Sequence, residues 1–265
     1  MEGFDVKRRR MSKRRMTGQG MTEFLVVAPL LLFFGFATMQ FVLLYQAKST
    51  LDVAVLEAAR EGSVNHGSMD AMQAGLARGL APLYARSADA AGVQSALLAA
   101  RRAVGEAASI EIVSPTPAMM RDFARPRLYP AEGAAHDEIP NDMLMYRDIE
   151  HGAESDVNVQ DANVLKLRVH YCFDLIVPVA NKVLYYATNV IGDIAANGVF
   201  SREPAQANVD AYGSPKRADR LCRTTLVDGW QSQRWPVALE SEALVRMQSP
   251  FRMDAANEVH ATAGH

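Results

Sequence analysis

The chain has 265 residues, of which 49% are hydrophobic and 22% charged, so most of it should fold into a packed structure. Its net charge of −2 hides an asymmetry, because residues 1–18 carry seven basic residues against two acidic ones. A nucleic-acid-binding tail would be one interpretation of this basic head. Nothing later in the sequence supplies a basic or aromatic groove, so we expect no nucleic-acid partner.

An apolar run without a charged side chain extends from Phe24 to Ala47. Its 24 residues would form a helix of about 36 Å, longer than the roughly 30 Å hydrocarbon core of a bilayer. The run is too long for a cleavable secretory signal and has no clear small-residue cleavage site, so it should remain as an anchor. The basic side should stay in the cytoplasm, and everything after Lys48 should lie outside, on the opposite side of the membrane.

The helical pattern continues past the apolar run, through "QAKSTLDVAVLEAAREG". Apolar residues recur there at helical spacing, and the charged residues fall largely on other faces. We predict one helix from about Gln19 to Glu61, half in lipid and half outside, with Gly62 as its C-cap. Pro29 should kink this helix or leave one carbonyl unpaired, which a membrane bundle can tolerate.

Two further helices are predicted in the Ala- and Leu-rich stretch 68–107, with breaks at Pro82 and at residues 87–92. The alternation in "SIEIVSP" then predicts a strand. Residues 115–160 are rich in Pro, Asp and Asn and show little periodicity. This predicts a long loop with a short helix near residues 142–147.

The clearest strand is "NVLKLRVHYCFDLIVP", in which alternate apolar residues from Leu165 to Phe173 share one face. A helix is expected in "VANKVLYYATNVIGDI" and another strand in "WPVALESEALVRMQS", with Trp230 and Trp235 packing the sheet. The predicted fold class is α+β, with a long N-terminal helix, further helices and one small antiparallel sheet of about three strands.

Four segments follow from these elements. Residues 1–18 should form a basic cytoplasmic leader, and residues 19–48 a transmembrane helix. Residues 49–253 should form an extracytoplasmic α+β domain, and residues 254–265 a disordered tail.

The segment "GQGMTEFLVVAPLLL" follows the basic leader with a glycine, four residues, an acid, an aromatic residue and an apolar helix. This order resembles the prepilin-peptidase site of type IV pilins. With a proline in the first turns of the anchor, it is most similar to the TadE/TadG-like pseudopilins of the tight-adherence (Flp/Tad) pilus. The later "LKLRVHYCFDLIVPVANKV" and "ALVRMQSPF" and the second cysteine, Cys222, are also similar to that family. Two departures are Gln19, where related pilins commonly have Phe or Met, and a second glycine at position 20.

The resemblance implies a pilin-like fold and processing by a membrane aspartyl prepilin peptidase. The peptidase would cut between Gly18 and Gln19 on the cytoplasmic face, with Glu23 and Phe24 completing the processing motif, and methylation of the new amine is a further expectation. The protein would then be a minor pseudopilin or assembly factor, at the inner membrane or within a pilus. Its partners would be the membrane, the peptidase, other pilin-like subunits and the pilus assembly machinery.

Physical chemistry also singles out Glu23, at the head of the apolar run. A carboxylate drawn to the bilayer centre costs up to roughly 2.5–3.5 kcal/mol, and less at the interface. A new N-terminal ammonium, on the same or a neighbouring subunit, would offset that cost and set the subunit register. The alternative is an interfacial residue at a helix N-terminus, where acidic residues are mildly favoured.

The two cysteines, Cys172 in the strongest strand and Cys222 in a polar stretch, should be oxidised outside the cytoplasm. A bridge between them would close a loop of about 50 residues and stabilise the fold by roughly 4 kcal/mol in the chain-entropy model. Two unpaired thiols are the alternative.

Common catalytic and metal-binding motifs are absent from the sequence, so we expect no enzyme activity, cofactor or metal. His136, Asp137 and Glu138 are adjacent, but such a cluster in a loop is usually a solvated surface. "DVNVQDAN" lacks the glycine and closing glutamate of a calcium loop. Two other functions stay open: an uncleaved single-pass scaffold of a secretion system, and a membrane-anchored extracytoplasmic enzyme.

Overall fold

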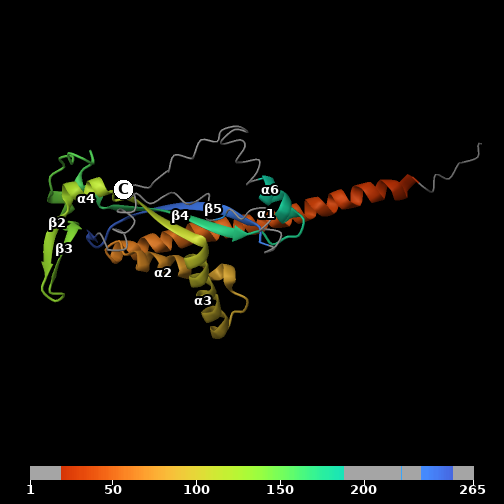
Figure 1. Cartoon of the computed structure of the whole chain (residues 1–265), viewed down its shortest axis with the longest axis horizontal. Helices are drawn as coiled ribbons and strands as arrows, with labels where there is room; N and C mark the ends of the chain where they lie inside the picture. Colours follow the sequence, from red (N-terminus) through yellow and green to blue (C-terminus); the bar gives the residue numbers. More distant parts are fainter. Residues whose placement is uncertain (1–18, 188–221, 223–233, 253–265) are drawn as a thin grey trace, which may run out of the picture.

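The structure is a computed structural model of the chain, and it describes residues 19–187, 222 and 234–252. Within these residues the fold is α+β, as the sequence predicts: a long N-terminal helix, further helices and antiparallel strands (Figure 1). The strands form two small sheets rather than the single sheet expected. The predicted leader (1–18), Trp230 and the predicted tail (254–265) lie outside the described residues.

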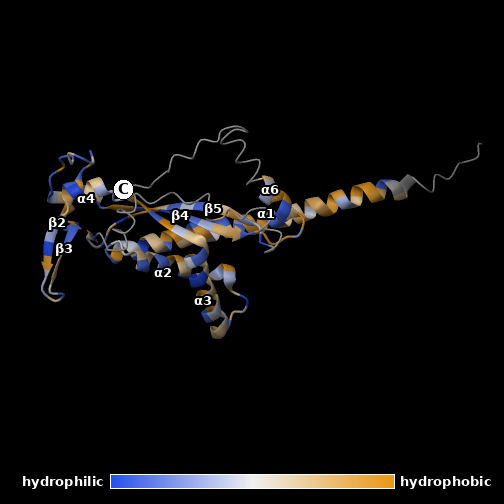
Figure 2. Cartoon of the chain, in the orientation of Figure 1, coloured by the Kyte–Doolittle hydropathy of each residue, from blue (hydrophilic) through white to orange (hydrophobic). Residues whose placement is uncertain are grey.

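The first helix, α1 (Gln19–Val64), has 46 residues and is therefore about 69 Å long. It continues through Pro29 as one helix. Its first half projects away from the folded body, and Figure 2 shows that this projecting part is predominantly hydrophobic. Its second half lies along the body.

The end of α1 differs from the prediction, because Gly62 lies inside the helix and is not its C-cap. The chain instead leaves the helix through His66 and Gly67, which have positive φ angles of 58° and 78°. The Gly67 N–H donates to the Gly62 carbonyl at 2.8 Å, a pattern typical of a helix C-terminus. At Gly62 an added Cβ would lie 2.8 Å from Met72 Cγ, so the glycine there serves close helix packing.

Two helices follow α1 where they were predicted, separated by a 3-10 turn that contains Pro82. Asp89 caps the second of them by accepting a hydrogen bond from the Gly92 N–H at 3.0 Å. The breaks predicted at Pro82 and at residues 87–92 are therefore confirmed. The elements are α2 (Met69–Leu80), η1 (Ala81–Tyr84) and α3 (Ala90–Ala107).

Small residues bring α1 and α2 close together. A Cβ added at Gly79 would lie 2.4 Å from Ala54 Cα, and one added at Gly75 would lie 2.9 Å from Ala58 Cα. Ala54 and Ala58 are themselves fully buried. Alanine on one helix and glycine on the other thus set the distance between the two backbones.

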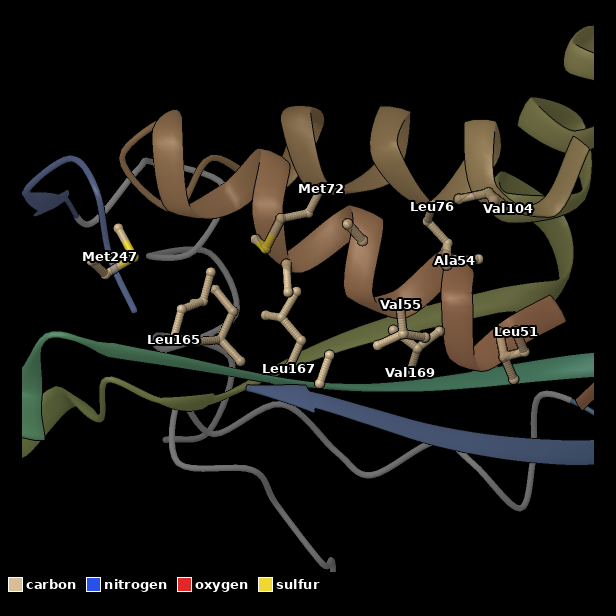
Figure 3. Close-up of a cluster of buried hydrophobic side chains, with 14 of the residues drawn as sticks. Leu51, Ala54, Val55, Met72, Leu76, Val104, Leu165, Leu167, Val169 and Met247 are labelled. Carbon is tan, nitrogen blue, oxygen red and sulfur yellow. The ribbon is translucent and has the colours of Figure 1, made fainter. Parts of the chain in front are cut away.

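The main sheet has the order β1-β4-β5, with both neighbouring pairs antiparallel. The central strand β4 pairs with β5 along its full length, from Val164 opposite Arg246 to Asp174 opposite Pro236. Figure 3 shows side chains of β4 pointing toward α1 and α2, with Leu165, Leu167 and Val169 facing Leu51, Val55 and Met72. The strands are β1 (Ala108–Ser114), β4 (Val164–Asp174) and β5 (Pro236–Arg246).

The stretch 115–160, expected as a long loop, contains most of a second sheet. Its hairpin turns around Gly133, whose φ of 65° favours glycine. The short helix expected near 142–147 is present as a 3-10 turn. The elements of this part are α4 (Pro117–Phe123), β2 (Arg125–Tyr129), β3 (Ala134–Ile139), η2 (Leu144–Tyr146) and α5 (Val159–Ala162), and β6 (Phe251–Arg252) completes the sheet in the order β2-β3-β6.

Candidate functional site

The candidate processing residues lie at the free end of α1. Gly18 is outside the described residues, and α1 begins at Gln19. Glu23 is one helical turn further on, and both Glu23 and Phe24 are exposed. Across residues 19–187, 222 and 234–252, no side chain forms an ion pair or hydrogen bond with the Glu23 carboxylate. This end of the helix is therefore accessible to another molecule.

The apolar half of α1 is exposed almost throughout, which distinguishes it from the core helix of a soluble protein. Gly35 is likewise open to its surroundings, since an added Cβ there would meet nothing within 4 Å. The helix is long and apolar enough to cross a membrane, and it fits a single-pass anchor. The exposed large apolar residues are Met21, Phe24, Leu25, Val26, Val27, Leu30, Leu31, Leu32, Phe34, Phe36, Met39, Phe41, Val42 and Tyr45.

The change from exposed to buried occurs within two turns of α1. Gln40 is completely buried, and from Ala47 onward one face of the helix is packed in the core. Lys48 and Asp52, charged residues that follow the apolar run, form an ion pair. Ser241 Oγ on β5 donates to Asp52 Oδ1 at 2.6 Å and so fixes this turn to the sheet.

Asp52 stays ionised in this position. Partial burial raises the pKa of its carboxyl, but hydrogen bonds from Lys48 and Ser241 outweigh that effect, so the pKa lies below its ordinary value. The polar boundary of the apolar run is thus a charged turn that is hydrogen-bonded to the sheet.

Gln40 joins α1 to the segment that follows β4. Its side-chain Oε1 accepts hydrogen bonds from the backbone N–H groups of Ile176, at 3.1 Å, and Val177, at 2.8 Å. Its Nε2 has no partner among the described residues. The sequence shows Gln40 only as a polar residue within an apolar run, and nothing local to it predicts this contact.

A small apolar cluster lies beside this contact, next to the helix α6 (Ala180–Tyr186). Trp235 is buried there, as the sequence predicts, with Leu175 and Tyr185, and Leu44 of α1 packs against them. The Tyr185 and Trp235 rings meet edge to face, with centroids 5.3 Å apart. Figure 1 shows α6 beside α1, at the point where the projecting half of α1 leaves the body.

The two cysteines form the expected disulfide, with Cα atoms 5.4 Å apart and 50 positions between them in the sequence. Cys172 lies near the end of β4, on the same strand that leads to the Gln40 contact. The bridge fastens Cys222 to the central strand of the main sheet.

In the His136–Glu138 cluster, Asp137 is exposed and His136 partly exposed, as expected of a solvated surface, but Glu138 differs. Glu138 is buried, and its carboxylate accepts hydrogen bonds from Tyr129, at 2.6 Å, and Arg252, at 3.3 Å. The Arg252 guanidinium also lies 4.1 Å from the centroid of the Tyr129 ring. Glu138 therefore joins β2, β3 and β6 as a structural residue. The β2–β3 hairpin supplies Tyr129, and the pairing of β3 with the distant strand β6 supplies Arg252.

No group of three or more His, Cys, Asp or Glu side chains that could hold a metal ion occurs within the described part of the chain. In "DVNVQDAN", the Asn158 side chain caps α5 by accepting a hydrogen bond from the Asp161 N–H at 2.8 Å. That segment thus has a structural explanation.

A family model described as "TadE-like protein" matches residues 18–60. The chain carries a TadE-like segment. The matched range begins at the predicted cleavage glycine and includes the whole exposed apolar half of α1 together with its first buried turns. The TadE-like segment therefore ends within the part of α1 that packs on the sheet. No curated protein and no solved structure matches the chain.

Proposed function

We propose that this chain is a minor pseudopilin or assembly factor of a tight-adherence type IV pilus. The observation that supports this most directly is the division of α1, which the TadE-like segment covers as far as residue 60: the first half of the helix is exposed and apolar, and the second half packs on an antiparallel sheet. Such a helix can be held by lipid before assembly and by the helices of neighbouring subunits afterwards. The role is structural rather than enzymatic.

The proposed topology places the basic leader in the cytoplasm and the α+β domain on the opposite, extracytoplasmic side of the inner membrane. The excess of basic residues before Gly18 supports this orientation, because positively charged flanks are retained on the cytoplasmic side. The Cys172–Cys222 disulfide agrees with it, since structural disulfides persist in oxidising compartments.

The proposed processing step is cleavage after Gly18 by a prepilin peptidase. Gln19 would then carry the new amine, one helical turn from the Glu23 carboxylate. This carboxylate has no partner among the described residues, so it can pair with the amine of its own chain or of a neighbouring subunit. The peptidase and other pilin-like subunits are thus the proposed partners.

Mass spectrometry of the N-terminus, in cells with and without the peptidase, tests the proposal. We expect a chain that starts at Gln19 when the peptidase is present and at Met1 when it is absent. Gly18→Val should block cleavage, because a side chain there prevents the backbone from entering the protease in extended form. Gly20→Val is the matched control and should still be cut.

A start at Met1 in the presence of the peptidase would instead favour an uncleaved single-pass scaffold. A start at Met21 would place the cut after the second glycine and would make Gly20→Val the blocked variant.

A further inference from the structure

The membrane boundary on α1 can be located from the length of the helix. Gln40 lies 17 residues after Glu23, which corresponds to about 26 Å along the helix axis. A hydrocarbon core of about 30 Å that begins at Glu23 therefore ends near residue 43. Any tilt of the helix would place Gln40 deeper, because the same number of residues then spans less of the membrane normal.

The folded body nevertheless covers Gln40 completely. Ile176 and Val177 lie against it, because their N–H groups bind its side chain. The neighbouring residues on other faces of α1 remain open, with Met39 58% and Phe41 54% exposed. The segment 176–177 thus reaches the level at which α1 is still surrounded by lipid, and Gln40 satisfies two backbone groups that hydrocarbon could not.

The surface that this segment and α6 expose is apolar. Ile176 is 68% exposed and precedes the helix, and Val179, the N-cap of α6, is 54% exposed. Val183 and Tyr186 are each 48% exposed and lie three residues apart on one face of α6. We call these four residues the α6 patch. The opposite side of α6 is already occupied, since Ala180 and Tyr185 are buried against the body.

Aromatic residues are exposed on both α1 and α6. Tyr45 is exposed on α1 just beyond the expected boundary, and Tyr186 is half exposed within the α6 patch. Tyrosine and tryptophan are enriched where a protein meets the headgroup layer, because their rings are amphipathic. The patch thus belongs to a helix that lies beside α1, at the point where the exposed apolar half of α1 leaves the body (Figure 1).

We propose that the α6 patch is a second membrane contact, which rests in the interfacial layer of the bilayer that α1 crosses. This proposal depends on the membrane anchoring proposed above. The partner is the lipid surface itself, since a short helix with an apolar outer face at this depth would bury that face by about 5–10 Å into the boundary of headgroups and acyl chains. Two contacts, α1 and α6, would fix the tilt and rotation of the folded domain on the membrane.

Photocrosslinking of the full chain in vesicles of phosphatidylethanolamine and phosphatidylglycerol tests this contact. A benzophenone amino acid replaces Val183 in one variant, Phe34 of the projecting helix in a second and Leu128 in a third. Leu128 is 67% exposed on β2, at the end of the body opposite to α6 (Figure 1). We expect adducts with the mass of one lipid at positions 183 and 34, and none at position 128.

The three positions separate the possible failures. Lipid adducts at 34 but not at 183 would overturn the α6 contact and leave the anchor intact, whereas none at either position would overturn both. Covalent dimers at 183 in place of lipid adducts would show that a second copy of the chain covers the patch, and would also overturn the proposal. Equal amounts of lipid adduct at positions 128 and 183 would also overturn the α6 contact, because lipid would then contact the domain without specificity.

Discussion

The Oε1 atom of Gln40 lies 2.8 Å from the backbone nitrogen of Val177, across 137 positions of sequence. Through this contact a polar side chain of the apolar run holds the chain segment that follows the central strand. Gln40→Leu should destabilise the fold by about 1–3 kcal/mol, because it leaves buried N–H groups without an acceptor. Thermal unfolding in detergent measures the loss.

Gln46→Leu is the matched control for this change. Gln46 is exposed six residues further along the same helix, and its substitution should leave the unfolding temperature nearly unchanged. If both variants unfold at the wild-type temperature, the Gln40 contact does not contribute to stability.

Close packing of α1 on α2 predicts opposite effects for two glycine substitutions. Gly79→Ala should destabilise the protein by about 1–3 kcal/mol, because the new methyl group would meet the Ala54 backbone. Gly105→Ala, on the exposed side of α3 with nothing within 4 Å, should stabilise it by about 0.5–1 kcal/mol. Denaturant unfolding compares the two, and equal effects would contradict the close approach of α1 and α2.

The Cys172–Cys222 disulfide should be present in protein purified from its native compartment. Reduction should change its mobility on a non-reducing gel, and Cys172→Ser or Cys222→Ser should each abolish the change. A loop of 50 residues corresponds to a loss of about 4 kcal/mol on reduction in the chain-entropy model. Free thiols in the native protein would disagree with the bridge.

Ion pairs on the outer face of the main sheet should make the free energy of unfolding depend on pH. Lys166, at 2.8 Å, and then Arg168, at 2.6 Å, bind the Glu242 carboxylate and lower its pKa below the ordinary value of 4.5. A lowered pKa in the folded state stabilises the fold above the unfolded pKa, and this stability is lost as pH falls through the folded pKa. The loss should therefore occur below about pH 4.5.

Unfolding temperatures measured from pH 7 to pH 3 test this dependence. Glu242→Gln should flatten the curve, whereas Glu106→Gln, at an exposed position of α3, should retain the wild-type shape. A wild-type slope in Glu242→Gln would show that other carboxylates dominate the acid response.

Glu23→Ala should separate processing from assembly. We expect normal cleavage after Gly18 but loss of surface pili, because the carboxylate is needed only once it can pair with a new amine. Glu23→Asp should retain part of the function. The measurements are the N-terminal mass and the pili recovered by shearing, and normal assembly of Glu23→Ala would make Glu23 an interfacial residue only.

Elements with a strong local period could be predicted from the sequence. The apolar run of α1, the alternation of β4 and β5, and the breaks between α2 and α3 are each encoded in neighbouring residues. The second sheet is not evident from the sequence, because β2 is short and largely exposed, β3 buries only its last two residues and β6 has only two residues. Gly62 was misassigned as a cap, because its packing partner, Met72, lies on another helix.

Composition and residue spacing alone predict a basic head, a segment able to cross a membrane, an acidic residue at the start of that segment and a folded domain after it. These properties follow from composition and spacing, which act locally. Tertiary structure alone decided that Glu138 is buried with Arg252, that Gln40 binds Val177 and that α6 lies beside the exposed half of α1. Each of these depends on residues distant in sequence, and a buried polar group is stable only where the fold brings it a partner.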